Sequence, residues 1–284
     1  MISDPRMGRI TQGTVFCGAC AEEYPGRPVW GIVITARCDT THEKTPIVNY
    51  LPVVTVEDWL QSHGGLLSID REYAETKNRF KNLLVKKQLS ETLLEVHSPI
   101  QIAAFNFPYP EESSGQKAAK ERKDADEARA IASRMSELTG CLDSPLPNRE
   151  TIGPVISSCL KSAELVVKEL VSHRLAGYYF LPTLGKLTEQ ASDKGYVVLL
   201  REVHHIPRQT VSRLISGVAK DEFRTPERSL RFDCFDFAYP VAELQSPWTE
   251  HLMQVFCNLF GRIGVSDPDK GLVAQIISSL DLTE

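Results

Sequence analysis

The chain has 284 residues, a length that suits one large domain or two ordinary ones. With 42% hydrophobic and 24% charged residues, it has the composition of a soluble globular protein. Its net charge of -5 gives no general attraction to nucleic acid, so binding of that kind would need a local basic patch.

Apolar runs are too short for a membrane protein, since none approaches the roughly 20 residues of a membrane-spanning helix. The start, MISDPRMGRITQG, lacks the apolar region of a signal peptide. We therefore expect a cytoplasmic protein that makes no membrane contact. Its seven cysteines should then be thiols, metal ligands or nucleophiles, because disulfides do not persist in a reducing compartment.

Short β-branched runs open the chain. TVFCG, PVWGIVITAR and PIVNYLPVVTV are separated by the turn-rich clusters EEYPGRP and DTTHEKTP, which is typical of consecutive antiparallel strands. We predict a strongly bent antiparallel sheet over residues 12–54. The period of two along a strand assigns two sets of side chains to opposite faces, namely Trp30, Ile32 and Ile34 against Val29, Val33 and Thr35.

Helices are expected next. Thr55 is a suitable N-cap for VEDWLQSH, and Gly64-Gly65 should end that helix. Apolar residues at helical spacing predict one long or two short amphipathic helices over 71–96. IQIAAFNF, within residues 100–107, resembles a strand, whereas GQKAAKERKDADEARAIASRMSELTG is a charged helix with a solvated face.

The last part of the chain mixes the two types of element. TIGPVISSCLKSAELVVKELVSHRL predicts a well-formed amphipathic helix, and YYFLP, GYVVLLREV and SLRFDCFDF predict strands. SPWTEHLMQVFCNLFGRIG predicts a final helix with Ser246 as N-cap. This order predicts an α+β protein, with a small N-terminal β module over 1–66 and a mixed, helix-rich body over 67–284.

A zinc site is one interpretation of the first cysteines. Cys17-x2-Cys20 and Cys38-x3-His42 supply three thiolates and an imidazole in two closely spaced pairs, as tetrahedral zinc requires. Alternatively, Cys38 ends a strand and the thiols are simply buried or at the surface, or the first pair is redox-active. If a turn brought Cys38 and His42 together, they could form a nucleophile and its base.

The segments GTVFCG, PGRPVWGIVIT and TPIVNYLPV resemble the opening of the SH3-like barrel of the MazF/PemK growth-inhibitor toxins, over residues 12–54. The resemblance implies an RNA-cleaving site with an arginine before proline, here Arg27, and a Ser or Thr at the end of the following long strand. Pro52 occupies that position, although Thr35 or Thr45 could supply a hydroxyl from a shifted strand. Because cleavage needs both a proton shuttle and a guanidinium, we expect no RNA cleavage by the unaided protein.

A second resemblance concerns the whole chain. Cys38-Asp39, together with SPWTEHLMQVFCNLFGRIGV, is similar to uncharacterised bacterial proteins associated with toxin-antitoxin or phage-defence operons. It implies an accessory or interaction protein of such a module, whose partner would be a protein such as an enzyme encoded nearby. This is our leading interpretation, and a ribonuclease of the MazF/PemK kind is the alternative.

A DNA-binding regulator is the third interpretation. RQTVSRLISG resembles the recognition helix of LacI-type repressors, which implies base contacts from Arg208, Gln209, Thr210 and Arg213. The preceding GYVVLLREV is too β-branched for the first helix of that motif, so an ordinary amphipathic helix is the competing interpretation. No phosphate-binding glycine motif is present, so we do not expect an NTPase or a Rossmann enzyme.

Overall fold

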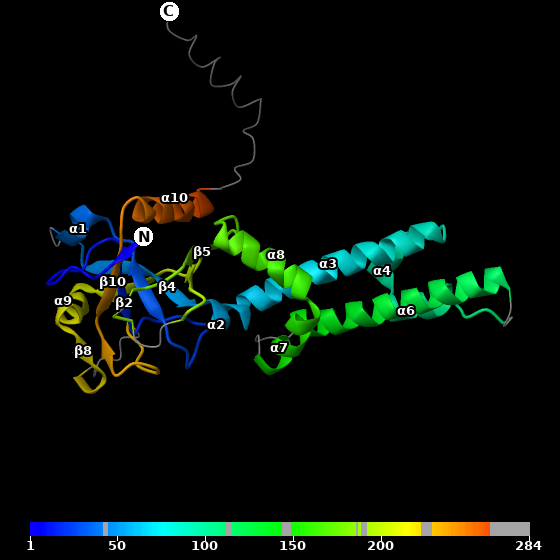
Figure 1. The fold of residues 1–284 in the computed structure, drawn as a ribbon, viewed down its shortest axis with the longest axis horizontal. Coiled ribbons are helices and arrows are strands. Elements are labelled where there is room, and N and C mark those ends of the chain that lie inside the picture. Colours follow the sequence, from blue (N-terminus) through cyan, green and yellow to red (C-terminus); the bar gives the residue numbers. More distant parts are fainter. Residues whose placement is uncertain are drawn as a thin grey trace, which may run out of the picture.

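The computed structural model describes residues 1–261 except 42–44, 112–114, 144–148, 186, 189–191 and 223–228. It is a mixed α+β protein in which a curled antiparallel sheet forms a half-barrel. Helices pack against this β body, and a long helical arm projects away from it (Figure 1). Among the described residues, no helix combines the length and apolar character needed to cross a bilayer.

The sheet brings the start of the chain beside residues 243–244. Every pairing in it is antiparallel, and β4 is long enough to pair with β3 along one edge and with both β6 and β7 along the other. The strands lie in the order β1 (Ile2–Ser3), β10 (Pro240–Leu244), β2 (Thr14–Cys17), β3 (Trp30–Val33), β4 (Ile47–Thr55), β6 (Tyr196–Leu199) and β5 (Tyr178–Leu181). The remaining strand of this sheet, β7 (His204–Pro207), pairs with β4 beside β6. Two further strands, β8 (Val218–Ala219) and β9 (Phe237–Ala238), pair only with each other.

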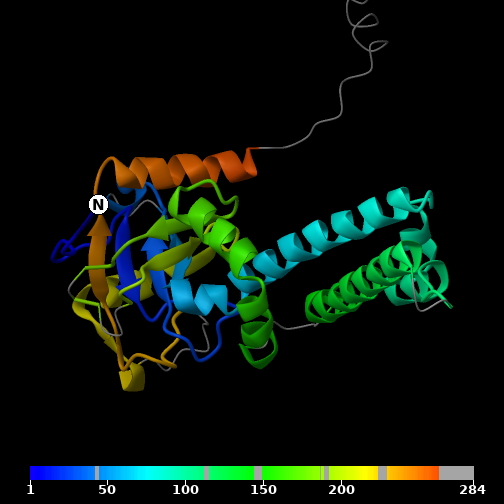
Figure 2. The ribbon, with the colours of Figure 1, turned by 45° about the vertical axis from the view of Figure 1, so that its right-hand side comes forward.

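Both faces of the sheet are buried. Trp30, Ile32 and Ile34 belong to one apolar cluster, and Val29 and Val33 to the other, as the alternation predicted. Helix α10 (Trp248–Phe260) covers the face that contains Trp30 and Ile32. Figure 2 shows this helix lying along the β body. The second face is covered by α2 (Val56–Leu60), α8 (Leu160–Val171) and α9 (Arg208–Ser216).

The predicted N-terminal β module is continuous with the rest of the sheet. Its strands β2, β3 and β4 lie between β10 on one side and β6 and β7 on the other. The domain boundary predicted near residue 66 therefore separates strands that belong to one hydrogen-bonded sheet. The SH3-like barrel stays a prediction.

Several predicted elements differ in the structure. The strand predicted to run to Arg37 ends at Val33, and α1 (Arg37–Thr41) follows. The Gly64-Gly65 pair does not end a helix but lies in the first turn of α3 (His63–Lys86). A Cβ on Gly64 would lie 2.6 Å from the Trp59 ring, so the glycine permits close packing between the two helices.

Three other predictions need correction. The apolar run IQIAAFNF is helix α5 (Pro99–Asn106), because Ser98 and Gln101 form a capping box and Pro99 occupies the first position. Most of SLRFDCFDF is irregular, since only Phe237 belongs to a strand. The helix predicted over 151–175 is two helices, α7 (Arg149–Ser158) and α8. The 3-10 turn η1 spans Lys220–Glu222.

The arm consists of α3 and α6 (Gln116–Leu142), which lie side by side in opposite directions (Figure 1). At 1.5 Å per residue, 27 residues make α6 about 40 Å long. α4 (Leu93–Val96) and α5 close the far end of the arm. The interior between these helices contains Phe80, Leu84, Ile102, Phe107, Ala125, Ala128 and Ile131. The small alanines of α6 let the helices approach closely.

Candidate functional site

The three predicted zinc ligands that the structure describes lie in different surroundings. Cys17 is buried in β2, and its thiol donates to the carbonyls of Phe237 (3.3 Å) and Tyr239 (3.6 Å), which suits a protonated thiol. Burial raises the pKa of Cys20, whose backbone N–H donates to the Tyr50 hydroxyl at 3.1 Å.

Of the second pair, the structure describes only Cys38. Cys38 is exposed in α1, and His42 lies outside the described residues. Within the described part of the chain, no group of three or more His, Cys, Asp or Glu side chains is placed to hold a metal ion. Zinc at these four residues stays a prediction, for which metal analysis of the purified protein is the test.

Arg27, the arginine implied by the toxin resemblance, is linked through a carboxylate to the hydroxyl of Thr55, and not to that of Thr35 or Thr45. Arg27 Nη1 lies 3.1 Å from Asp58 Oδ1, and Thr55 Oγ1 donates to Asp58 Oδ2 at 2.8 Å. The Thr35 hydroxyl instead accepts from the backbone N–H of Asn49 (2.7 Å), and that of Thr45 donates to the carbonyl of Ile47 (2.8 Å). The structure therefore connects Arg27 to Thr55 through one carboxylate.

Sequence reasoning identified Thr55 as a helix cap and missed this second contact. Its hydroxyl does accept from the Asp58 N–H at 3.0 Å, as a cap should. The available signal was the length of the apolar run, because β4 continues past Pro52 and ends at Thr55.

The helix predicted to read DNA is tied into the fold. Strand β7 precedes α9 directly, in the place where a helix-turn-helix has its first helix. Arg208 donates to the carbonyls of Asp39, Thr40 and Thr45 at 3.2–3.3 Å, and so holds the ends of the segment that contains α1.

The other side chains of that set behave differently. Thr210 is buried, Arg213 donates to the carbonyl of Glu222 at 3.2 Å, and Gln209 is exposed. Of the four, only Gln209 both is exposed and makes no hydrogen bond to another described segment. The arrangement is that of an amphipathic helix packed on the sheet.

The far end of the arm exposes an apolar surface. Helix α5, PIQIAAFN, has no charged residue, and only Ile102 and Ala103 within it are buried. Its outer side presents Ile100 (55% exposed) and Phe105 (81%) to solvent. A helix that is apolar on all sides is normally buried on all sides. We call the exposed side chains at this end the tip surface: Val85, Val96, Ile100, Phe105 and Tyr109.

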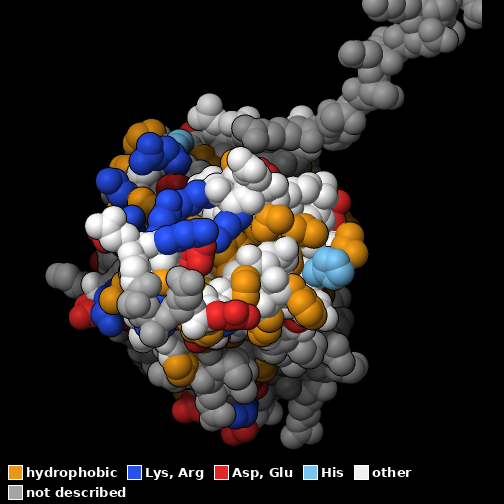
Figure 3. All heavy atoms as spheres, turned by 90° about the vertical axis from the view of Figure 1, so that its right-hand side faces the viewer, with side chains coloured by type: hydrophobic (Ala, Val, Ile, Leu, Met, Phe, Trp, Pro, Cys, Tyr) orange, Lys and Arg blue, Asp and Glu red, His pale blue; other side chains and the backbone are white. Residues whose placement is uncertain are grey.

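This concentration of apolar side chains is local. Among the described residues, fourteen large apolar side chains are exposed, and five of them lie within residues 85–109. Figure 3 looks at the arm end-on and shows apolar side chains gathered beside a row of Lys and Arg. Exposed basic residues at this end are Lys86, Lys87, Lys117, Lys120, Arg122 and Lys123. Contiguous apolar surface with a charged border is typical of an interaction site.

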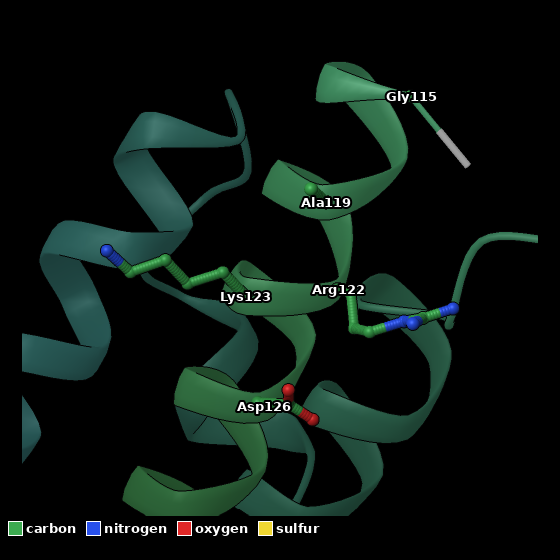
Figure 4. A pocket seen from close by; sticks show the side chains of 5 residues that line it. All are labelled: Gly115, Ala119, Arg122, Lys123 and Asp126. Carbon is green, nitrogen blue, oxygen red and sulfur yellow. The ribbon is translucent and has the colours of Figure 1, made fainter. Parts of the chain in front are cut away.

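The first turns of α6 border a shallow hollow of about 380 Å³ (Figure 4). It is lined by Gly115, Ala119, Arg122, Lys123 and Asp126, and Figure 4 shows Arg122 and Lys123 pointing to opposite sides of the helix. All five residues belong to α6 or its N-cap, so the hollow lacks a second wall of described residues. By itself it has no ligand-binding geometry.

Asp126 has a clearer role at Tyr109. The Tyr109 hydroxyl donates to Asp126 Oδ1 at 2.8 Å, and this hydrogen bond raises the pKa of Tyr109. The Arg129 guanidinium lies 4.1 Å from the centre of the Tyr109 ring, a cation–π contact. These two contacts hold one aromatic side chain of the tip surface in place.

Comparison with protein-family models, with curated proteins and with solved structures gives no significant match.

Proposed function

We propose that this protein is an interaction protein that binds another protein through the tip surface of its arm. One observation carries the proposal, namely that α5 has no charged residue and is mostly apolar while Ile100 and Phe105 face solvent. Complete burial of one such side chain contributes about 1.5–3 kcal/mol, so several of them can anchor a partner. The partner would complete the apolar environment that the fold leaves open on one side of α5.

The charges around the tip surface favour an acidic partner. The row of Lys and Arg beside the apolar area adds a positive border in a chain whose net charge is -5. A complementary negative border would steer the encounter and set the orientation of the complex. Length supports the same role, because an arm of about 40 Å places the tip surface well away from the β body.

The biological setting of the proposal comes from the sequence. Similarity to proteins of bacterial toxin-antitoxin and phage-defence operons supports an accessory role, with an enzyme encoded nearby as the partner. That partner would engage the arm while the β body remains free.

Co-purification with the products of neighbouring genes is the direct test. In Phe105→Asp, a charge replaces the most exposed side chain of the tip surface, and we expect the complex to be lost while the free energy of unfolding stays within about 0.5 kcal/mol. Leu160→Asp is the matched control, because Leu160 is 68% exposed on α8, away from the tip. Equal binding by wild type and Phe105→Asp would contradict the proposal, and equal loss in both variants would exclude the tip as its location.

A ribonuclease is the second candidate, and the contact network Arg27–Asp58–Thr55 is the observation that favours it. It unites the guanidinium and the strand-end hydroxyl that the toxin resemblance implies. Asp58 neutralises Arg27, however, and this competes with the binding of a phosphate. We therefore still expect no cleavage of long single-stranded RNA by the purified chain. Cleavage that is lost in Arg27→Ala and kept in the exposed control Arg37→Ala would establish the ribonuclease instead.

A further inference from the structure

A separate pocket of about 320 Å³ lies in the β body, where four parts of the chain meet. The segment between β2 and β3 contributes Glu22 and Glu23, the start of α3 contributes His63, and the remaining lining residues are Gly177, Tyr178, Leu199, Arg201 and Glu202. We call it the Glu–His pocket. Its volume is at the lower end of the range for ligand sites, which indicates a small ligand.

Glu23 is held by a chain of hydrogen bonds. Its Oε2 lies 2.6 Å from His63 Nε2, the opposite ring nitrogen lies 2.7 Å from the Tyr24 hydroxyl, and Ser62 donates to that hydroxyl at 2.8 Å. Burial raises the pKa of Tyr24, so its hydroxyl stays protonated and can donate to His63 Nδ1. Although the Glu23 side chain is 51% exposed, its carboxylate therefore has a defined position at the pocket.

Glu202 is held in a similar way from the other side. Its Oε1 accepts from the backbone N–H of Glu22 at 2.7 Å and lies 2.6 Å from His204 Nε2. The His204 ring in turn stacks on Tyr50, with 5.5 Å between centroids. Two carboxylates that line one pocket are thus each supported by an imidazole with its own buried aromatic contact.

The pocket also contains an aromatic wall and a guanidinium that makes no ion pair with another described residue. The Tyr178 ring packs edge-on against Trp59 at 5.2 Å and lies beside His63. Arg201 lies across Gly177, where a Cβ would come within 2.9 Å of its Nε, and it makes no ion pair with another described residue. The pocket therefore offers fixed acceptors, an aromatic face and a guanidinium.

We infer that the Glu–His pocket binds a small zwitterionic molecule of the amino acid type. The carboxylates of Glu22, Glu23 and Glu202 outnumber the one guanidinium, which favours an ammonium or guanidinium group beside the Tyr178 ring. Arg201 receives the carboxylate of the ligand through paired N–H donors. Recognition of both charges distinguishes this ligand from a simple amine and from a simple carboxylic acid. The inference is independent of the tip surface.

Calorimetric titration of the full chain tests it with the twenty common amino acids, agmatine and glutarate. We expect at least one amino acid with a basic side chain to bind, agmatine to bind roughly tenfold more weakly than arginine because it lacks the carboxylate, and glutarate not to bind. Absence of binding by every amino acid would overturn the inference. So would equal binding of agmatine and arginine.

Two variants locate the site. Glu23→Gln keeps a hydrogen-bond acceptor for His63 and removes the charge, so it should weaken amino acid binding roughly tenfold. Arg201→Gln should remove the preference for arginine over agmatine. Glu95→Gln is the control, because it makes the same charge change on an exposed residue of the arm. The unfolding midpoint of each free variant checks that the fold is intact. Binding that is unchanged in both pocket variants would place the site elsewhere and contradict the inference.

Discussion

Gly31 occupies a position in β3 where two aromatic rings meet. The Phe16 and Tyr50 rings stand edge-to-face at 5.1 Å, one on each neighbouring strand. A Cβ on Gly31 would lie 2.4 Å from Phe16 Cζ and 2.8 Å from Tyr50 Cδ2. We expect Gly31→Ala to lower the free energy of unfolding by about 1–3 kcal/mol, because buried rings have little room to move. Chemical denaturation followed by circular dichroism measures this.

Gly140 provides the matched control. It lies within α6, and a Cβ added there would have no neighbour within 4 Å. Gly140→Ala should raise the stability by about 0.5–1 kcal/mol, because glycine loses more backbone entropy than alanine in a helix. A loss of stability in both variants would show that steric contact at Gly31 is not the cause.

His173 gives the stability of the protein a dependence on pH. Burial lowers its pKa, and nearby His251 lowers it further. The ring stacks on Tyr179 at 4.2 Å, and Trp248 and His251 of α10 face it at 6.4 and 5.4 Å. As the pH falls below the ordinary value near 6.5, the unfolded chain therefore binds a proton before the folded one does.

The sign follows from that difference in proton binding. Stability from neutral His173 is fully present above about pH 6.5 and is lost as the pH falls towards the lowered pKa of the folded state. We expect His173→Asn to reduce the loss of stability between pH 7 and pH 5, and asparagine tolerates the positive φ of 55° at this position. Urea unfolding at several pH values is the measurement. An identical pH dependence in the variant and the wild type would refute this role.

At the scale of single elements, α5 depends on its cap. The Ser98 hydroxyl accepts from the Gln101 N–H at 3.3 Å, and the Gln101 side chain accepts from the Ser98 N–H at 3.1 Å. An eight-residue helix has few internal hydrogen bonds, so this capping box contributes much of its local stability. The conformation of the tip surface is thereby coupled to one serine.

We expect Ser98→Ala to destabilise α5 by about 1 kcal/mol. Faster hydrogen exchange of the amides in residues 100–106, with unchanged exchange in the strands, is the expected result. A change spread over the whole chain would instead show that α5 unfolds only together with the β body.

At the scale of the whole molecule, the edge strand β1 pairs with β10 and brings the chain start beside residue 244. Glu243 is only 1% exposed, and Arg6 Nε lies 2.9 Å from its Oε2. Among the described residues, the Glu243 carboxylate has no hydrogen-bond partner apart from this ion pair. Arg6 thus compensates a buried charge at the edge of the sheet.

Removing Arg6 should therefore cost more than an ordinary surface substitution. We expect Arg6→Met to lower the free energy of unfolding by about 1–3 kcal/mol, because it leaves a buried carboxylate unpaired. The double variant Arg6→Met with Glu243→Gln should recover part of that loss. Thermal unfolding of the wild type, the two single variants and the double variant separates the energy of the ion pair from the loss of packing. Additive changes in the free energy of unfolding would contradict the ion-pair explanation.

The sequence by itself determined the elements whose signals are local. The alternation around Trp30 and Ile32 assigned the two faces of β3 correctly, and the charged pattern of α6 predicted a helix. These predictions succeed because the period of side chains along a strand or helix depends only on neighbouring residues. IQIAAFNF shows the limit of this reasoning. A short apolar run fits a strand and a buried helix equally well, and the capping box outside the run decides between them.

Only the tertiary structure decided which distant segments meet. It placed β2, β3 and β4 between β10 and β6 in one sheet, gathered the Glu–His pocket from residues between 22 and 202, and connected Arg27 to Thr55 through Asp58. None of these contacts has a local signature, because strand pairing and packing are set by complementary surfaces that the chain brings together only on folding. The exposed side of α5 follows in the same way. Most of its residues are apolar, and only the packing of the arm determines which of them remain in solvent.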